Sequence, residues 1–191
     1  MKRLSIICIL LLLPIAAWAW MNVTTVGGGG VPSEGGGGTE RLYPDADITT
    51  GWDSWSGPPH WSICDDTYES ETEADGGVAT VSGSQEAFGF ANPTSMGAGN
   101  TATQLVFHFW GKAGGASTSE TMAVKYSTDG GSNWSSTTNV VFTSNTYAYQ
   151  TATFSSLSLS LANIQGLAVH FQRTAGTTSI VISAVSCVVT Y

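Results

Sequence analysis

The sequence predicts an all-β protein: a two-sheet antiparallel β-sandwich of about eight strands, arranged like a jelly roll. Apolar and polar residues alternate with a period of two in several separate stretches. Segments rich in Gly, Ser, Thr and Asn divide these stretches. After residue 19, no window long enough to trust has the period of a helix.

The alternation is clearest in three stretches, residues 105–110, 122–126 and 167–172. Leu105, Phe107 and Phe109 fall on one face of the first stretch, and His108 falls on the other. His170 likewise falls on the outward face of its strand, so we expect neither histidine in the core. Turns are predicted between the strands, at residues 97–100, 113–117, 129–132 and 175–178.

The last predicted strand, residues 180–191, contains a change of register. Its apolar residues occupy even positions up to residue 182 and odd positions from residue 185. A β-bulge, or a crossing of the strand between sheets, near Ser183 and Ala184 would explain this change. The even set is Ile180 and Ile182, and the odd set is Val185, Cys187, Val189 and Tyr191.

The chain begins with features typical of export. Residues 1–19 have a basic start, an apolar run and a small-x-small ending, as in a signal peptide cleaved after Ala19. An uncleaved anchor helix is the alternative, although the apolar run is short for a bilayer span of roughly 20 residues. We therefore expect a secreted, periplasmic or cell-surface protein, with a flexible glycine-rich linker at residues 20–40 and a folded domain at 41–191.

The charge of the chain limits its partners. Without residues 1–19, four basic residues remain against fourteen acidic ones, a formal charge of −10. Such a surface repels phosphate backbones, so a nucleic-acid partner is not expected. No membrane span is expected after cleavage of the signal peptide.

Cys64 and Cys187 are the cysteines that follow the signal peptide. In a compartment outside the cytoplasm, where disulfides persist, they can form a disulfide. The loop that this disulfide would close is long enough to stabilise the fold by roughly 4–5 kcal/mol. We expect this bridge because the first and last strands of sandwiches are often neighbours. Two buried free thiols are the alternative.

The stretch Tyr126–Trp134, YSTDGGSNW, contains a pattern formed by Ser127, Asp129, Gly131 and Trp134. This pattern resembles the Asp-box of sialidases and other exported β-proteins. The resemblance implies a structural hairpin turn in which Asp accepts backbone hydrogen bonds and Gly supplies a positive φ. Sialidase activity is excluded, because its site needs three arginines and only Arg41 and Arg173 follow the signal peptide.

Residues 65–75 are strongly acidic. Glu69, Glu71 and Glu73 alternate as in jelly-roll β-glucanases, but Ser and Thr replace the apolar residues expected between them. The same segment offers calcium four candidate ligands, although without the spacing of an EF-hand. We interpret it first as a solvated acidic loop, and second as a calcium site formed by Asp65, Asp66, Glu69 and Glu71.

The segment from Gly51 to Trp61 is the main candidate for ligand binding. Aromatic side chains in a loop interrupted by Gly and Pro either cap the core or present a flat face to a sugar ring. Trp110 and Trp134 are expected in the core or at its edge. The carbohydrate-binding hypothesis rests on Trp52, Asp53, Trp55, His60 and Trp61.

The runs Leu42–Trp52 and Val185–Tyr191, with Asp65 and Asp66 between them, resemble uncharacterised β-sandwich modules of phage and bacterial surface proteins. This resemblance implies an extracellular or virion-associated role, structural or adhesive. We expect a non-catalytic domain for surface attachment or for binding polysaccharide or cell-surface glycan. The alternatives are a self-associating structural subunit of an extracellular assembly and a small glycoside hydrolase using Glu69 and Glu73.

Overall fold

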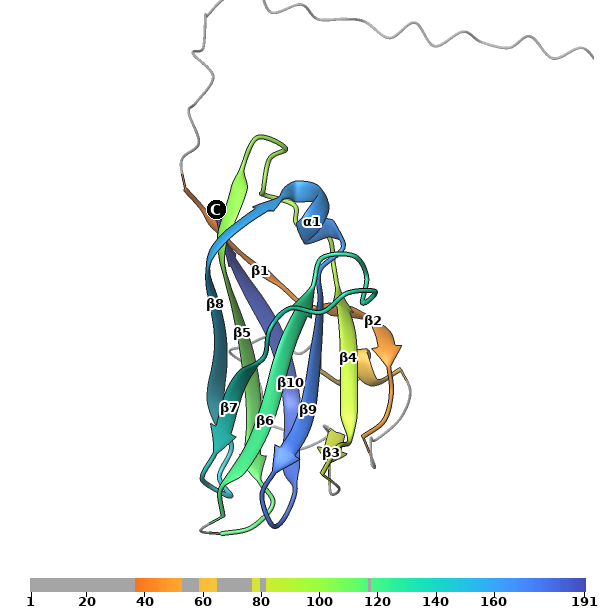
Figure 1. Ribbon diagram of the computed structural model, residues 1–191, viewed down its shortest axis with the longest axis vertical. Helices are drawn as coiled ribbons and strands as arrows, with labels where there is room; N and C mark the ends of the chain where they lie inside the picture. Colours follow the sequence, from red (N-terminus) through yellow and green to blue (C-terminus); the bar gives the residue numbers. More distant parts are fainter. Residues whose placement is uncertain (1–36, 53–58, 65–76, 80–81, 117) are drawn as a thin grey trace, which may run out of the picture. The chain divides into compact units, whose positions relative to one another are not determined.

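A computed structural model describes residues 37–52, 59–64, 77–79, 82–116 and 118–191. In these residues ten strands form two antiparallel sheets of five, which face each other as a sandwich (Figure 1). The predicted fold class is confirmed, with two more strands than expected. Sheet A contains β1 (Thr39–Leu42), β3 (Gly77–Ala79), β5 (Thr101–Ala113), β8 (Ala148–Ser160) and β10 (Ile180–Thr190). Sheet B contains β2 (Pro44–Thr49), β4 (Gln85–Phe90), β6 (Glu120–Ser127), β7 (Thr138–Phe142) and β9 (Ala168–Ala175).

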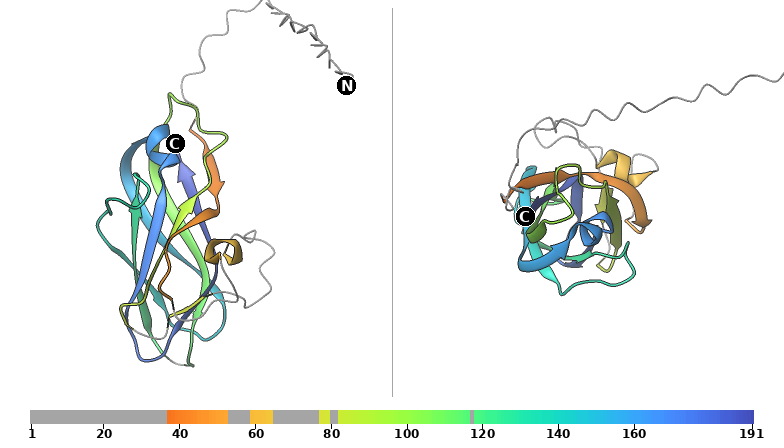
Figure 2. Two further views of the ribbon diagram at one scale, coloured as in Figure 1. Left: turned by 90° about the vertical axis from the view of Figure 1, so that its right-hand side faces the viewer. Right: turned by 90° about the horizontal axis from the view of Figure 1, so that it is seen from above.

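The strand order is that of a jelly roll. Sheet A runs β1-β10-β5-β8, with β3 also paired to β10, and sheet B runs β2-β4-β9-β6-β7. Four nested antiparallel pairs follow from this order, β1 with β10, β4 with β9, β5 with β8, and β6 with β7. Successive pairs alternate between the sheets, as in a long hairpin rolled up on itself. Figure 2 shows the two layers from the side and from above.

The core lies between the sheets and follows the period-two pattern of the sequence. In β5, Leu105, Phe107 and Phe109 are fully buried, whereas the alternate residues are partly exposed. Phe109 and Phe88 both contact Phe171 of β9 edge-on, with ring centroids 5.6 and 5.4 Å apart. The contact of Phe109 with Phe171 joins the two sheets, because β5 belongs to sheet A and β9 to sheet B, whereas Phe88 of β4 meets Phe171 within sheet B.

The predicted change of register in β10 is confirmed. The pairing with β5 shifts between Ile182 and Ala184. Ile182 and Val185, on either side of the shift, are both buried, so one extra residue keeps both apolar sets facing the core.

The first and last strands are neighbours. The backbones of Gly38 and Tyr191 exchange two hydrogen bonds, so β1 begins inside the segment expected to be a linker. Two short helices, η1 (His60–Ile63) and α1 (Leu161–Gln165), complete the described elements. Neither of these helices has the length and hydrophobicity needed to cross a membrane.

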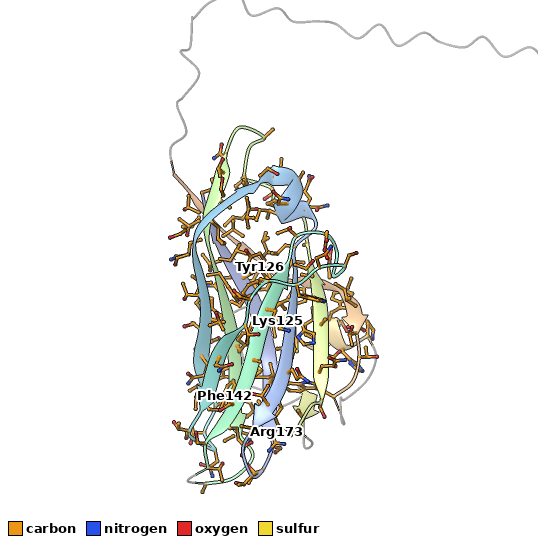
Figure 3. The ribbon with its side chains drawn as sticks, viewed as in Figure 1. Lys125, Tyr126, Phe142 and Arg173 are labelled. Carbon is orange, nitrogen blue, oxygen red and sulfur yellow. The ribbon has the colours of Figure 1, made fainter. Side chains whose placement is uncertain are left out.

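A buried ion pair secures the end of sheet B next to the turn between β9 and β10. Arg173 of β9, labelled in Figure 3, contacts Glu120 of β6 through two guanidinium nitrogens. Its Nε lies 3.0 Å from Oε2 of Glu120, and its Nη2 lies 2.9 Å from the same oxygen. The other carboxylate oxygen accepts hydrogen bonds from the backbone N–H groups of Thr177 and Thr178. Burial opposes ionisation of Glu120, but these hydrogen bonds outweigh it and lower its pKa.

Candidate functional site

Two carboxylates hold the described parts of the Gly51–Trp61 segment, residues 51, 52 and 59–61, against sheet B. Asp47 of β2 accepts hydrogen bonds from the backbone N–H groups of His60 and Trp61, at 2.9 and 2.8 Å, and so caps the start of η1. Glu86 of β4 accepts hydrogen bonds from the backbone N–H groups of Gly51 and Trp52, at 3.1 and 3.2 Å. The conformation of this segment therefore depends on residues of two strands.

Glu86 also contacts a histidine. Its Oε1 lies 3.0 Å from Nδ1 of His60, whose side chain remains 17% exposed, whereas Glu86 is completely buried. Burial raises the pKa of Glu86, against the opposing effect of the hydrogen bonds from Gly51, His60 and Trp52. The contact fixes the orientation of the imidazole, as a carboxylate does for a catalytic or metal-bound histidine. Among the described residues, however, no group of three or more metal-binding side chains is found.

Trp52 is a core residue, which corrects its assignment to a ligand-binding surface. It is 5% exposed, and its ring meets that of Phe171 edge-on at 5.1 Å. The indole is buried in the core cluster, and neither ring face is available to a sugar. Trp61 is partly buried and also packs against the core. Asp53 and Trp55 lie outside the described residues.

The predicted disulfide is not found in the structure. Cys64 and Cys187 are both completely buried, and no disulfide joins them. The carbonyl of Cys64 accepts a hydrogen bond from the backbone N–H of Val185, so both cysteines lie along β10 within the core. Burial raises the pKa of the Cys187 thiol.

The acidic residues Asp65, Asp66, Glu69, Glu71 and Glu73, on which the predicted calcium site and the alternative hydrolase depend, lie outside the described residues. The ends of their segment are described. Cys64 contacts β10 at Val185, and Gly77 pairs with Ile182. The segment therefore starts and finishes beside the same strand of sheet A.

The Ser127–Trp134 pattern forms the turn between β6 and β7. Asp129 accepts hydrogen bonds from the hydroxyl of Ser127 at 2.6 Å and from the backbone N–H of Asn133 at 2.8 Å. With the Asn133 side chain, these bonds lower the pKa of Asp129 to about 2. Gly131 has a φ of +89°, and Trp134 packs beside His170 with ring centroids 5.3 Å apart. These hydrogen bonds join groups within the turn and stabilise its conformation.

The largest outward-facing aromatic cluster in the described residues lies on sheet A, where the sequence did not predict it. Trp110 of β5 is paired with Tyr149 of β8, and their ring centroids are 4.5 Å apart. Tyr147, just before β8, lies 6.0 Å from Trp110 with nearly parallel ring planes. The amino group of Lys112 lies 4.3 Å from the centre of the Tyr147 ring. We call these four residues the aromatic cluster.

The aromatic cluster faces away from the core. Trp110 and Lys112 alternate in β5 with Phe109, Gly111 and Ala113, which are buried, and all four cluster residues are partly exposed. The sequence contained a signal for this, because Trp110 has the same parity as His108 and Lys112. The size of Trp110 and its position at the end of an apolar run nevertheless favoured a place in the core or at its edge.

A basic group lies further along the same outer face. Arg41 of β1 donates a hydrogen bond of 2.6 Å to the hydroxyl of Ser186 in β10, and Ser186 is the cross-strand partner of His108 in β5. Burial, and then the positive charge of Arg41, lower the pKa of His108. His108 and His170 belong to different sheets, so they do not form a common site.

Comparison of the chain with protein-family models, curated proteins and solved structures gives no match.

Proposed function

We propose that the domain is a non-catalytic attachment module that binds carbohydrate on the outer face of sheet A. The observation that carries the proposal is the aromatic cluster, in which Trp110 and Tyr149 lie side by side on paired strands and Tyr147, just before β8, lies beside Trp110, all partly exposed. Aromatic rings with an apolar surface and a polar edge suit the C–H faces of sugars. Paired strands hold Trp110 and Tyr149 without the cost of ordering a loop.

Five of the six carboxylate side chains in the described residues, all except Asp45, act as acceptors within the fold. Glu40, Asp47, Glu86, Glu120 and Asp129 each accept hydrogen bonds from at least two backbone or side-chain donors of the fold. Carboxylates engaged in this way are structural acceptors, whereas a retaining glycosidase needs two that face a substrate about 5–5.5 Å apart.

The test is binding of the purified protein to a panel of soluble and insoluble polysaccharides, beside Trp110→Ala and Tyr149→Ala. Trp134→Ala is the matched control, because it removes the same side chain from the turn over sheet B. We expect Trp110→Ala to weaken binding by at least about tenfold, as for an aromatic residue at the centre of an interface. Thermal unfolding shows whether each variant remains folded. Equal binding by the wild type and Trp110→Ala would contradict the proposal.

A structural subunit is the second candidate, and strand β7 favours it. In the described structure β7 lies at an edge of sheet B and pairs with β6 alone. Its sequence, TNVVF, has neither charge nor proline, and Val141 is 41% exposed. Edge strands without such protection pair readily with other strands. Self-association at micromolar concentration without glycan, lost in Val141→Lys, would favour this candidate.

A further inference from the structure

The chain contains a long uncharged stretch. Residues 130–172 include no Asp, Glu, Lys, Arg or Pro, although the formal charge of residues 20–191 is −10. This stretch supplies β7, β8, α1 and most of β9. In the described residues β7 and β8 are edge strands, β7 pairing with β6 alone and β8 with β5 alone. They lie at the same side of the sandwich (Figure 1), so one side of the molecule ends in two uncharged strands.

The opposite side of the sandwich is protected against pairing with other strands. The edge strand of sheet B there is β2, which contains Pro44, Asp45 and Asp47 and whose pairing with β4 shifts register twice. In sheet A this edge is shared by β1, with Glu40 and Arg41, and by β3, which has three residues. Proline, charge, irregular pairing and short length are the features by which edge strands avoid other chains. The β7 side has neither proline nor charge, so it is the side open to another chain.

Of the two uncharged edge strands, β7 is better suited to pair with another strand. Its Val140 and Phe142 are buried in the core, whereas Asn139 and Val141 are exposed on the outer face of sheet B. In β8 the exposed residues are all Thr or Ser. The pairing of β8 with β5 is also interrupted where Ser156 has a φ of +58°. Such an irregularity turns part of an edge away from partners, and β7 pairs with β6 without one.

We propose that β7 pairs with β7 of a second copy of the chain, antiparallel across a two-fold axis, and joins the two B sheets into one sheet of ten strands. Residues that stand opposite each other in such a pair point to the same face, so Val140 and Phe142 must stand opposite core-facing residues. A register centred on Val140 meets this condition and pairs all five residues of β7. In this register Asn139 stands opposite Val141 of the second copy.

A second copy suits this edge because the strand is complementary to itself. Across a two-fold axis each free N–H group of β7 meets a C=O group of the same strand in the other copy, so the pairing needs no other sequence. Two copies with a net charge of −10 repel each other, and this repulsion is weakest where their uncharged sides meet. The acidic segment at residues 65–75 starts and finishes beside β10, and β5 separates β10 from β8.

The pairing of β7 develops the second candidate function and does not depend on glycan binding. A two-fold axis that continues sheet B is perpendicular to the sheet, so the outer faces of both A sheets point in the same direction. The aromatic clusters of the two copies would then face one surface. Two linked weak sites bind a polymer more tightly than one site alone.

Sedimentation velocity without glycan measures the association of the wild type, Val141→Lys and Ile48→Lys. Ile48 is the matched control, because it is the other exposed large apolar side chain in the described residues and lies on β2, at the protected edge. We expect wild-type dimers at about 100 µM, weakened at least about tenfold by Val141→Lys, which places two ammonium groups close together, and unchanged by Ile48→Lys. Raising salt from about 0.15 M to 1 M should strengthen the wild-type dimer, since salt screens the net repulsion. Thermal unfolding shows whether each variant remains folded.

Disulfide crosslinking tests the register. Residues directly opposite each other in an antiparallel pair have Cα atoms about 4.5–5.5 Å apart, which a disulfide can span. Asn139→Cys and Val141→Cys, mixed and oxidised, should therefore form covalent dimers faster than either variant alone. The control is Asn139→Cys mixed with Lys125→Cys, because Lys125, labelled in Figure 3, lies on β6 and away from the edge. The native thiols of Cys64 and Cys187 are completely buried and should not react.

Four results would overturn this inference: a monomer at concentrations up to about 1 mM, a dimer weakened equally by Val141→Lys and Ile48→Lys, a dimer dissociated by salt, or crosslinking no faster in the mixture than in the controls. A monomer that binds polysaccharide through Trp110 leaves the proposed carbohydrate-binding function standing. A crosslinked dimer that binds no polysaccharide supports the inference and overturns that function.

Discussion

His60 and Glu86 are joined through a 3.0 Å contact between Nδ1 and Oε1, although 26 positions separate them in the sequence. The second oxygen of the same carboxylate accepts the backbone N–H groups of Gly51 and Trp52. One buried side chain of β4 therefore fixes the chain on both sides of residues 53–58. The bond to the Trp52 amide holds the backbone at the point where the buried indole enters the core.

Replacing Glu86 by Ala should destabilise the fold by about 2–4 kcal/mol, because it removes the acceptor of the buried Trp52 amide and the partner of His60. Urea unfolding measures the loss. Relative to the wild type, hydrogen exchange in the variant should increase more at the Trp52 amide than at the amides of β5. Unchanged stability would mean that the segment is held without Glu86.

The stability difference between the wild type and Glu86→Gln should change with pH. Burial raises the pKa of Glu86 in the folded state, so folding disfavours the ionised form relative to the unfolded chain. The wild type should gain stability as pH falls through this raised pKa towards the ordinary value near 4.5, and Gln cannot titrate. Denaturation at pH 7.5, 6 and 5 measures the difference. A constant difference would contradict a raised pKa.

Arg173→Met should cost about 3–5 kcal/mol, since it leaves Glu120 buried without its counter-ion. The double variant with Glu120→Gln should recover part of this loss. In the wild type the pKa of Glu120 is lowered, so its contribution is complete above about pH 4.5 and is lost as pH falls through the lowered value. Arg173→Met should therefore lose less stability than the wild type between pH 5 and pH 3. An equal loss would show that the ion pair does not lower this pKa.

Alanine substitutions at two adjacent glycines should differ in cost. Gly130 and Gly131 both have positive φ, +69° and +89°. A Cβ at Gly130 meets no atom within 4 Å, whereas at Gly131 it would lie 3.0 Å from Ile48 and 3.3 Å from Trp134. We expect about 1 kcal/mol for Gly130→Ala and more for Gly131→Ala, from urea unfolding. The reverse order would contradict the packing of this turn on Ile48.

Cys64 and Cys187 should resist alkylation in the native protein and react after unfolding in guanidinium without a reductant. Both are completely buried, and burial also raises the pKa of Cys187, which removes the reactive thiolate. Mass spectrometry of the peptides that contain each cysteine measures the modification. A requirement for reductant would show that the protein in solution contains the disulfide.

Local sequence patterns predicted the strands well because burial on one face of a strand is a property of neighbouring residues. The alternation in β5 and the bulge in β10 could be read directly, since each depends on which residues of one strand are apolar. In the described residues the two helices, α1 and η1, have five and four residues, in agreement with the absence of long helical periodicity after residue 19.

The sequence by itself determined the fold class, the turn at Ser127–Trp134 and the outward position of His108 and His170, because these follow from contacts within a few residues. Only the tertiary structure decided which aromatic side chains face solvent. Trp52 lies in a loop, but its backbone is held by Glu86 of β4 and its indole is buried. The outward parity of Trp110 was present in the alternation of β5, but its position beside Tyr149 follows from the pairing of β5 with β8. Both contacts join segments distant in sequence, and composition or periodicity within one segment contains no information about such contacts.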